Sequence, residues 1–106
     1  MLEEKQDERL TDELLSWVKN YLDITWEDED TDAKILGIVL RGMTFLDHIA
    51  GEELTYSEGA TATQLLMDYA RYARAGTLPS FARDFQGELM GLHFVGEVNS
   101  YGTDGV

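Results

Sequence analysis

Residues 28–32 read DEDTD, and acidic residues at alternating positions are how a calcium-binding loop begins. Such a loop needs oxygen ligands at positions one, three and five, a glycine at six and a bidentate glutamate at twelve. The first three places are filled, by Asp28, Asp30 and Asp32, but position six is Ala33 and position twelve is Val39. Because the turn-forming glycine and the closing carboxylate are both missing, we interpret the aspartates as the acidic first turn of a helix, where the helix dipole favours negative charge.

The two histidines, His48 and His93, are the next candidates for metal binding or proton transfer. A di-metal helical bundle places a glutamate three residues before each histidine, whereas this chain has Phe45 and Met90 there. No pattern in the sequence pairs a nucleophile with a neighbouring base. We therefore expect no catalytic residue, no metal site and no cofactor, and we do not expect an enzyme.

Arginines and tyrosines alternate in residues 69–74, which read YARYAR. Such interleaving can clamp nucleic acid by stacking. The simpler interpretation is that the tyrosines belong to an apolar helix face, while Asp68 pairs with Arg71 three residues on. The overall charge favours this second interpretation. A sharper version assigns contacts with an acidic neighbouring subunit to this region, with Arg71, Arg74, Arg83 and Tyr72 as the candidates.

The composition supports a small acidic domain without disulfides. The chain has 106 residues, no cysteine, and 21 acidic against 8 basic residues, for a net charge of −13. This charge argues against non-specific binding to DNA or to an anionic membrane. Residues 1–58 carry a net charge of −11 and residues 59–106 only −2, which suggests two different surfaces. The longest apolar run, residues 35–40, is too short to span a bilayer, and the acidic start lacks a signal-peptide pattern, so we expect a soluble cytoplasmic protein.

The spacing of apolar residues predicts an all-α bundle of about four helices. The first should follow an N-cap at Thr11 and reach about Asp23, and the second should run from about residues 31–32 to Ala50. The third should cover about 60–75, and a fourth should begin near Pro79. Gly51 and Gly76 are the expected C-caps. We expect a frayed N-terminus over residues 1–10, a helical domain over 11–93, and an extended or disordered, flexible tail over 94–106.

Four further glycines fall inside the expected helices, where each is unfavourable relative to alanine. Gly37 and Gly42 are candidates for places where another backbone comes close. Gly87 and Gly91 have the GxxxG spacing, which permits tight helix packing or is coincidental in a chain without an apolar 20-residue stretch.

The order of these segments resembles the head–tail connector proteins, or head-completion adaptors, of tailed bacteriophages. A short helix ends in VKNYLDI, an acidic EDEDTD follows, and a second helix ends in FLDHIAG. The loop EELTYSEG, the helix QLLMDYARYARAG and then LPSFARDFQGELMGLH complete the pattern. The similarity covers about residues 10–98 and is one of arrangement across helices, with no catalytic signature.

The resemblance implies a helical subunit that docks on the portal protein and forms a ring, expected to be twelve-fold. The ring would extend the DNA exit channel and present a surface to the next head-completion or tail protein. It implies a place in the virion at the head–tail interface, and in the host cytoplasm during assembly. Asp28, Asp30 and Asp32 would then face the channel or a partner. The alternative is a small acidic regulatory or inhibitory protein-binding module that mimics nucleic acid. Neither function involves a membrane or sequence-specific binding of nucleic acid.

Overall fold

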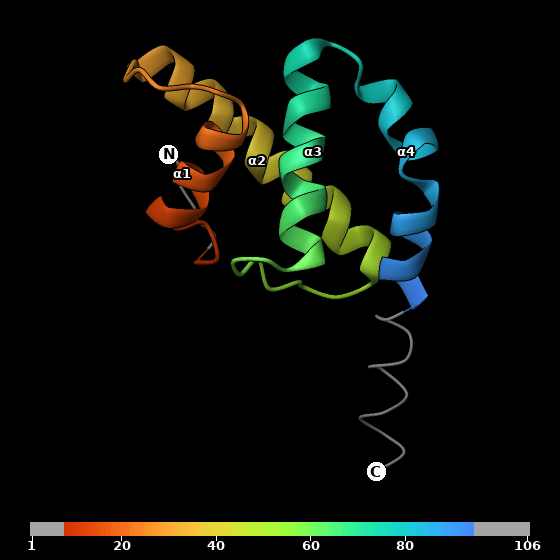
Figure 1. Ribbon diagram of the computed structural model, residues 1–106. Coiled ribbons are helices and arrows are strands. Elements are labelled where there is room, and N and C mark those ends of the chain that lie inside the picture. The colour runs from red at the N-terminus through yellow and green to blue at the C-terminus, as the bar shows by residue number, and fades with distance from the viewer. Residues whose placement is uncertain (1–7, 95–106) are drawn as a thin grey trace.

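The computed structural model describes residues 8–94, and these residues form helices and no strand. This confirms the predicted all-α class. Its elements are α1 (Asp12–Tyr21), α2 (Glu29–Ala50), α3 (Thr61–Ala75), the 3-10 helix η2 (Leu78–Ser80) and α4 (Phe81–Asp84), followed by a final helical segment over residues 86–94. α2 runs diagonally behind α3, with α1 against its first half and the final helical segment near its end (Figure 1).

The helix ends follow from their capping residues. The Thr11 hydroxyl accepts a hydrogen bond from the Leu14 N–H, and Gly51 and Gly76 take left-handed conformations with φ of 76°, so these three predicted caps are confirmed. α2 begins at Glu29, before the predicted start, because the Asp28 side chain accepts a hydrogen bond from the Thr31 N–H and acts as its N-cap. α1 ends at Tyr21, before the predicted end.

The core lies where α2 and α3 cross, and α1, α4 and residues 86–94 close it from the sides. The most deeply buried large side chains come from four helices: Leu14, Val18, Ile35, Val39, Met43, Leu46, Leu66 and Phe81. A Cβ atom added at Gly42 would lie 2.8 Å from side-chain carbons of both Leu66 and Tyr69. The close approach predicted at Gly42 is therefore confirmed. The neighbouring atoms belong to side chains of α3, however, and not to a backbone as predicted.

The other three glycines inside the expected helices have no close neighbour from another element within the described residues. A Cβ atom at Gly37 would meet only Arg41 of its own helix, and nothing lies within 4 Å of one at Gly87 or Gly91. Of the two alternatives for the GxxxG spacing, coincidence therefore fits the part of the chain that the structure describes.

The predicted fourth helix is interrupted at Phe85. Its backbone, with φ of −112° and ψ of 26°, ends α4, and helical structure resumes at residue 86. The ring of Phe85 stacks on Phe81 with centroids 4.9 Å apart and meets Tyr72 edge-on at 5.6 Å. The contact with Tyr72 is formed with α3, so periodicity along the chain could not reveal it.

The predicted frayed N-terminus is wrong for residues 8–10. Arg9 donates to both carboxylate oxygens of Asp47, at 3.1 and 2.7 Å, and to the Leu54 carbonyl oxygen at 2.7 Å. Asp47 also accepts from the Leu54 N–H and the Tyr56 hydroxyl, so it ties the chain before α1 to the loop after α2. Residues 1–7 lie outside the described residues. The predicted tail, residues 94–106, also lies outside the described residues except for residue 94, which is helical.

Candidate protein-interaction surfaces

Exposed carboxylates gather where α1 ends and α2 begins. We call this surface the acidic end, and its members are Asp23, Glu27, Asp28, Glu29 and Asp30. The Asp28 carboxylate accepts from the Thr31 N–H at 2.9 Å and from its hydroxyl at 2.8 Å, and these hydrogen bonds lower the pKa of Asp28. The aspartates thus form the start of a helix, as interpreted from the missing calcium-loop residues.

The three predicted acids have different roles in the structure. Asp28 caps α2, as described above. Asp32 forms an ion pair with Lys19 of α1 at 2.8 Å, and the hydrogen bond in this pair raises the pKa of Lys19. Asp30 is exposed and has no ion pair within residues 8–94. Of the three, Asp30 is the carboxylate most available to a partner.

Three of the four predicted contact residues belong to one polar network that joins α3 to α4. Arg71 pairs with Asp68 at 3.4 Å, which confirms the pairing expected from their spacing, and its guanidinium carbon lies 4.9 Å from the Tyr72 ring centroid. The Tyr72 hydroxyl donates to Asp84 at 2.8 Å, and Arg83 pairs with the other oxygen of Asp84 at 3.4 Å. Arg71 and Tyr72 are therefore occupied within the subunit.

Asp68 is the buried member of this network. Its side chain is buried and accepts hydrogen bonds from the Tyr21 hydroxyl of α1, at 2.5 Å, and from the Gln64 amide, at 3.3 Å. The bond to Asp68 is the main reason why the pKa of Tyr21 is raised. Arg71 thus compensates a buried carboxylate, and this role limits its use as an interface residue.

The fourth predicted residue, Arg74, forms no ion pair within residues 8–94, although it lines a pocket beside Arg71 and Asp23. It lines a groove between α2 and α3 together with Lys34 and Arg41, and we call this the cationic groove. Its other lining residues are uncharged: Thr31, Ala33, Ile35, Gly37, Ile38 and Ala73. Sequence reasoning missed Lys34 and Arg41. Their spacing of seven residues, about two helical turns, was a signal that both lie on one side of α2.

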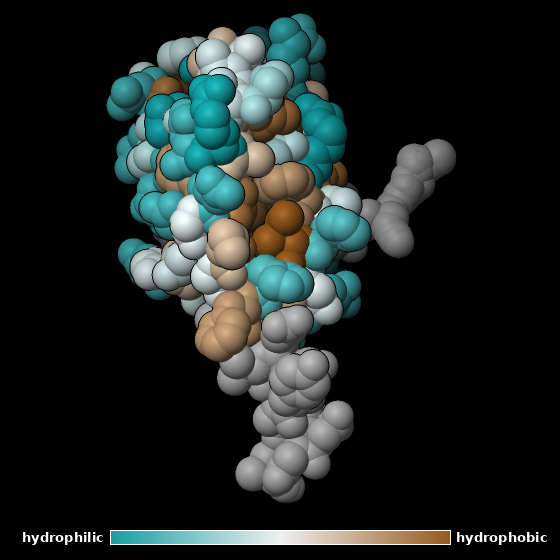
Figure 2. All heavy atoms as spheres, turned by 90° about the vertical axis from the view of Figure 1, so that its right-hand side faces the viewer, coloured by the Kyte–Doolittle hydropathy of each residue, from teal (hydrophilic) through white to brown (hydrophobic). Residues whose placement is uncertain are grey.

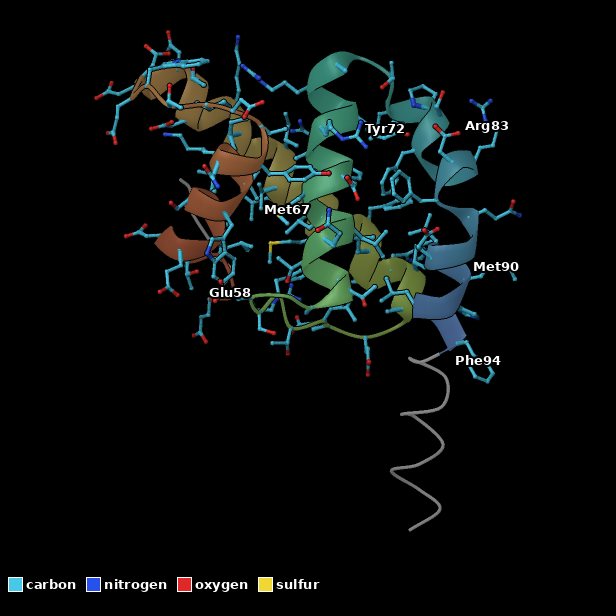
Figure 3. All side chains as sticks on the ribbon, in the orientation of Figure 1. Glu58, Met67, Tyr72, Arg83, Met90 and Phe94 are labelled. Carbon is cyan, nitrogen blue, oxygen red and sulfur yellow. The ribbon has the colours of Figure 1, made fainter. Side chains whose placement is uncertain are left out.

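A second groove lies on the opposite side of the molecule, between the end of α2 and the α4 side. We call it the apolar groove, and it is lined by Ile49, Ala82, Arg83, Gln86, Leu89, Met90 and His93. Met90 and Phe94 are 65% and 64% exposed. Figure 2 shows hydrophobic residues at the centre of this side with hydrophilic residues around them, and in Figure 3 Arg83, Met90 and Phe94 project away from α3.

The histidines do not meet. His48 is exposed in the last turn of α2, and His93 Nδ1 lies 3.0 Å from the Ile49 carbonyl oxygen. Residues 8–94 bring together no three histidine or carboxylate side chains that could hold a metal ion. His93 thus helps to attach the final helical segment to α2.

Comparison with known proteins adds no relative: no family model, curated protein or solved structure matches this chain. Within the described range, no helix has the length and apolar character needed to cross a membrane.

Proposed function

We propose that this chain is a structural subunit of a phage or prophage head–tail connector, which docks on the portal protein and forms a ring around the DNA exit channel. The proposal rests on the resemblance in segment order and on the distribution of surfaces over the helical fold. The protein works by contact, and its functional groups are the side chains that partners cover.

The apolar groove is the observation that carries the proposal. Large exposed apolar patches rimmed by polar residues mark protein interfaces, and methionine, aromatic residues and arginine are enriched in them. Met90 and Phe94 are both about two-thirds exposed, and Arg83, whose side chain is 76% exposed, lies at the same groove. We assign portal docking to this surface.

The opposed surfaces also suit a ring. The start of α2, which carries most of the acidic end, and residues 86–94, which line part of the apolar groove, lie on opposite sides of α3 (Figure 1). A ring is built from heterologous contacts, in which two different patches of one subunit meet, so every subunit must carry unlike surfaces. Carboxylates that face the channel would repel the DNA backbone and keep it from adhering as it passes.

Co-production with the portal protein encoded in the same genome tests the proposal. We expect a complex that elutes as one species, larger than the portal assembly alone. The double variant Met90→Asp/Phe94→Asp should lose this complex, while Thr44→Asp, a change at an exposed position of α2, should keep it. The proposal fails if the unaltered chain does not associate with the portal, or if both variants bind equally well.

The net charge of −13 favours one alternative, a small acidic module that mimics nucleic acid. Such a mimic spreads its carboxylates over one continuous face. Here the cationic groove begins about one turn after the acidic end on α2, which interrupts such a face. If the chain blocks a DNA-binding protein and does not bind the portal, the alternative is the better description.

A further inference from the structure

The basic residues divide into two groups. Of the eight in the chain, Lys5 lies outside the described range, and four pair with a carboxylate of the same subunit: Arg9, Lys19, Arg71 and Arg83. The remaining three, Lys34, Arg41 and Arg74, have no ion pair within residues 8–94, and all three line the cationic groove. Among the described residues, the positive charge without an ion-pair partner thus lies at one place.

We infer that the cationic groove of one subunit receives the acidic end of a neighbouring copy of the same chain. The inference rests on the proposed function, because it names the contact that would link subunits into the ring. It also revises which arginines make that contact. Arg71 and Arg83 are held by carboxylates of their own subunit. Of the predicted arginines only Arg74 therefore remains, and Arg41 joins it.

Neither Arg41 nor Arg74 forms an ion pair with the subunit's own acidic end within residues 8–94, although Asp23 of that end lines a pocket together with Arg74. Glu29 and Arg41 are twelve residues apart on α2, which corresponds to about 18 Å along a helix at 1.5 Å per residue. Lys34 is closer, four residues after Asp30, and its charge contributes to the lowered pKa of Asp28 after the hydrogen bonds from Thr31. Arg41 and Arg74 therefore retain the charge that a partner can use.

The chemistry of the groove favours a short acidic protein segment over nucleic acid. A polyphosphate chain that reached the groove would run past a molecule of net charge −13, which would repel it over most of its length. A short segment with a few carboxylates needs only the local positive charge. The acidic end also carries Trp26, which is 48% exposed beside Glu27, and arginine stacks favourably on indole rings. Trp26 and Glu27 would thus meet Arg41 and Arg74 with an aromatic face and a carboxylate.

Charge exchange is the first test, with self-association measured by sedimentation of the full chain at low salt. We expect Arg41→Glu/Arg74→Glu to weaken self-association about tenfold or more, and Glu29→Lys/Asp30→Lys to do the same. The chain that carries all four changes should associate again, because the charges are exchanged between the two surfaces. Arg83→Glu is the matched control and should associate like the unaltered chain.

Cross-linking tests the geometry. Because the chain has no cysteine, introduced cysteines are unique. With Thr25→Cys/Ala73→Cys, which leave every charged residue of the two surfaces in place, and a short bis-maleimide, heterologous contacts give a ladder of trimers and larger species. A symmetric dimer would stop at two chains. Thr25→Cys/Thr55→Cys, which places the second cysteine at an exposed loop position outside the groove, measures random collisions.

Several outcomes would overturn the inference: no cross-linked species above this control, products that stop at dimers, or self-association unaffected by Arg41→Glu/Arg74→Glu. Binding of a double-stranded DNA probe that this variant abolishes would also overturn it and assign the groove to nucleic acid. Portal binding is a separate measurement, and it tests the proposed function. If the portal binds but no ladder forms, this inference fails and the proposed function stands. If a ladder forms without portal binding, this inference stands and the proposed function fails.

Discussion

The Tyr72 hydroxyl donates a hydrogen bond of 2.8 Å to the Asp84 carboxylate and so joins α3 to α4. The same ring meets both Phe81 and Phe85 edge-on, with centroids 5.6 Å away. This residue therefore combines a polar and an apolar contact across one helix pair. The helix pair in turn sets the position of residues 86–94 and of the apolar groove that they line.

Replacing Tyr72 separates these two contributions. Tyr72→Phe should destabilise the fold slightly, since it removes only the hydrogen bond, and Tyr72→Ala should destabilise it more, since it also removes the ring contacts. The bond to Asp84 is the main cause of the raised pKa of Tyr72. Its contribution to stability is thus complete below the ordinary tyrosine pKa of 10.0 and is lost as the pH rises through the folded-state value. Urea unfolding at neutral pH compares the two variants, and equal stability would contradict the contribution of the ring contacts. A tyrosinate absorbance titration tests the pH dependence.

Gly42 and Gly87 should respond to alanine with opposite signs. A Cβ atom at Gly42 would clash with Leu66 and Tyr69, so Gly42→Ala should destabilise the protein by about 1–3 kcal/mol. Gly87 has open space around it in a helical segment, and Gly87→Ala should stabilise by about 0.5–1 kcal/mol. Thermal unfolding of both variants compares them directly. Destabilisation by Gly87→Ala would mean that this face packs against another part of the protein.

Asp47 should be the most sensitive acidic residue for stability. Its partly buried carboxylate accepts hydrogen bonds from Arg9, Leu54 and Tyr56. Asp47→Ala would leave these donors without their acceptor, and we expect a loss of about 2–3 kcal/mol. Glu58→Ala, at an exposed loop position, should change stability by less than about 0.5 kcal/mol. Similar urea midpoints for the two variants would refute this role of Asp47.

The helices could be predicted from the sequence because their signals are local. Apolar residues recur at helical spacing, and Thr11, Gly51 and Gly76 act within one turn of the helix ends that they cap. The start of α2 was placed too late because the acidic run offers several capping residues, and only the structure distinguishes Asp28 from them. Phe85, where α4 ends, meets the Tyr72 ring of α3, and no local pattern contains this contact.

The surfaces were harder to predict because charge in a sequence does not show which charges are already compensated. Arg71, Arg74 and Arg83 form a natural group by position, but Asp68 and Asp84 pair with the first and the last. Lys34 and Arg41 could have been grouped by their spacing on one helix. That Arg74 joins them depends on how α2 crosses α3, which is a property of the folded protein.

Charge reversal at the two neighbouring arginines of α3 should therefore have different effects. Arg71→Glu places a carboxylate beside the buried Asp68, and we expect it to destabilise the fold by about 1–2 kcal/mol. Arg74→Glu, at an exposed position, should change stability by less than about 0.5 kcal/mol. Circular dichroism during urea unfolding measures both. Equal losses would show that Arg74 is also needed within the subunit.

Asp28 should contribute to stability in a pH-dependent way. The hydrogen bonds from the Thr31 N–H and hydroxyl lower the pKa of Asp28 below its ordinary value of 3.8. A lowered folded-state pKa stabilises the protein above the unfolded-state value, and this contribution is lost as the pH falls through the folded-state value. Asp28→Ala should therefore be less stable than the unaltered chain at neutral pH. The difference in stability should shrink as the pH falls below the ordinary value of 3.8. Asp30→Ala, which removes an exposed carboxylate that is not the N-cap of α2, is the matched control. Melting temperatures of the three proteins across acid pH test this, and a constant difference between Asp28→Ala and the unaltered chain would show that the Asp28 carboxylate does not cap α2.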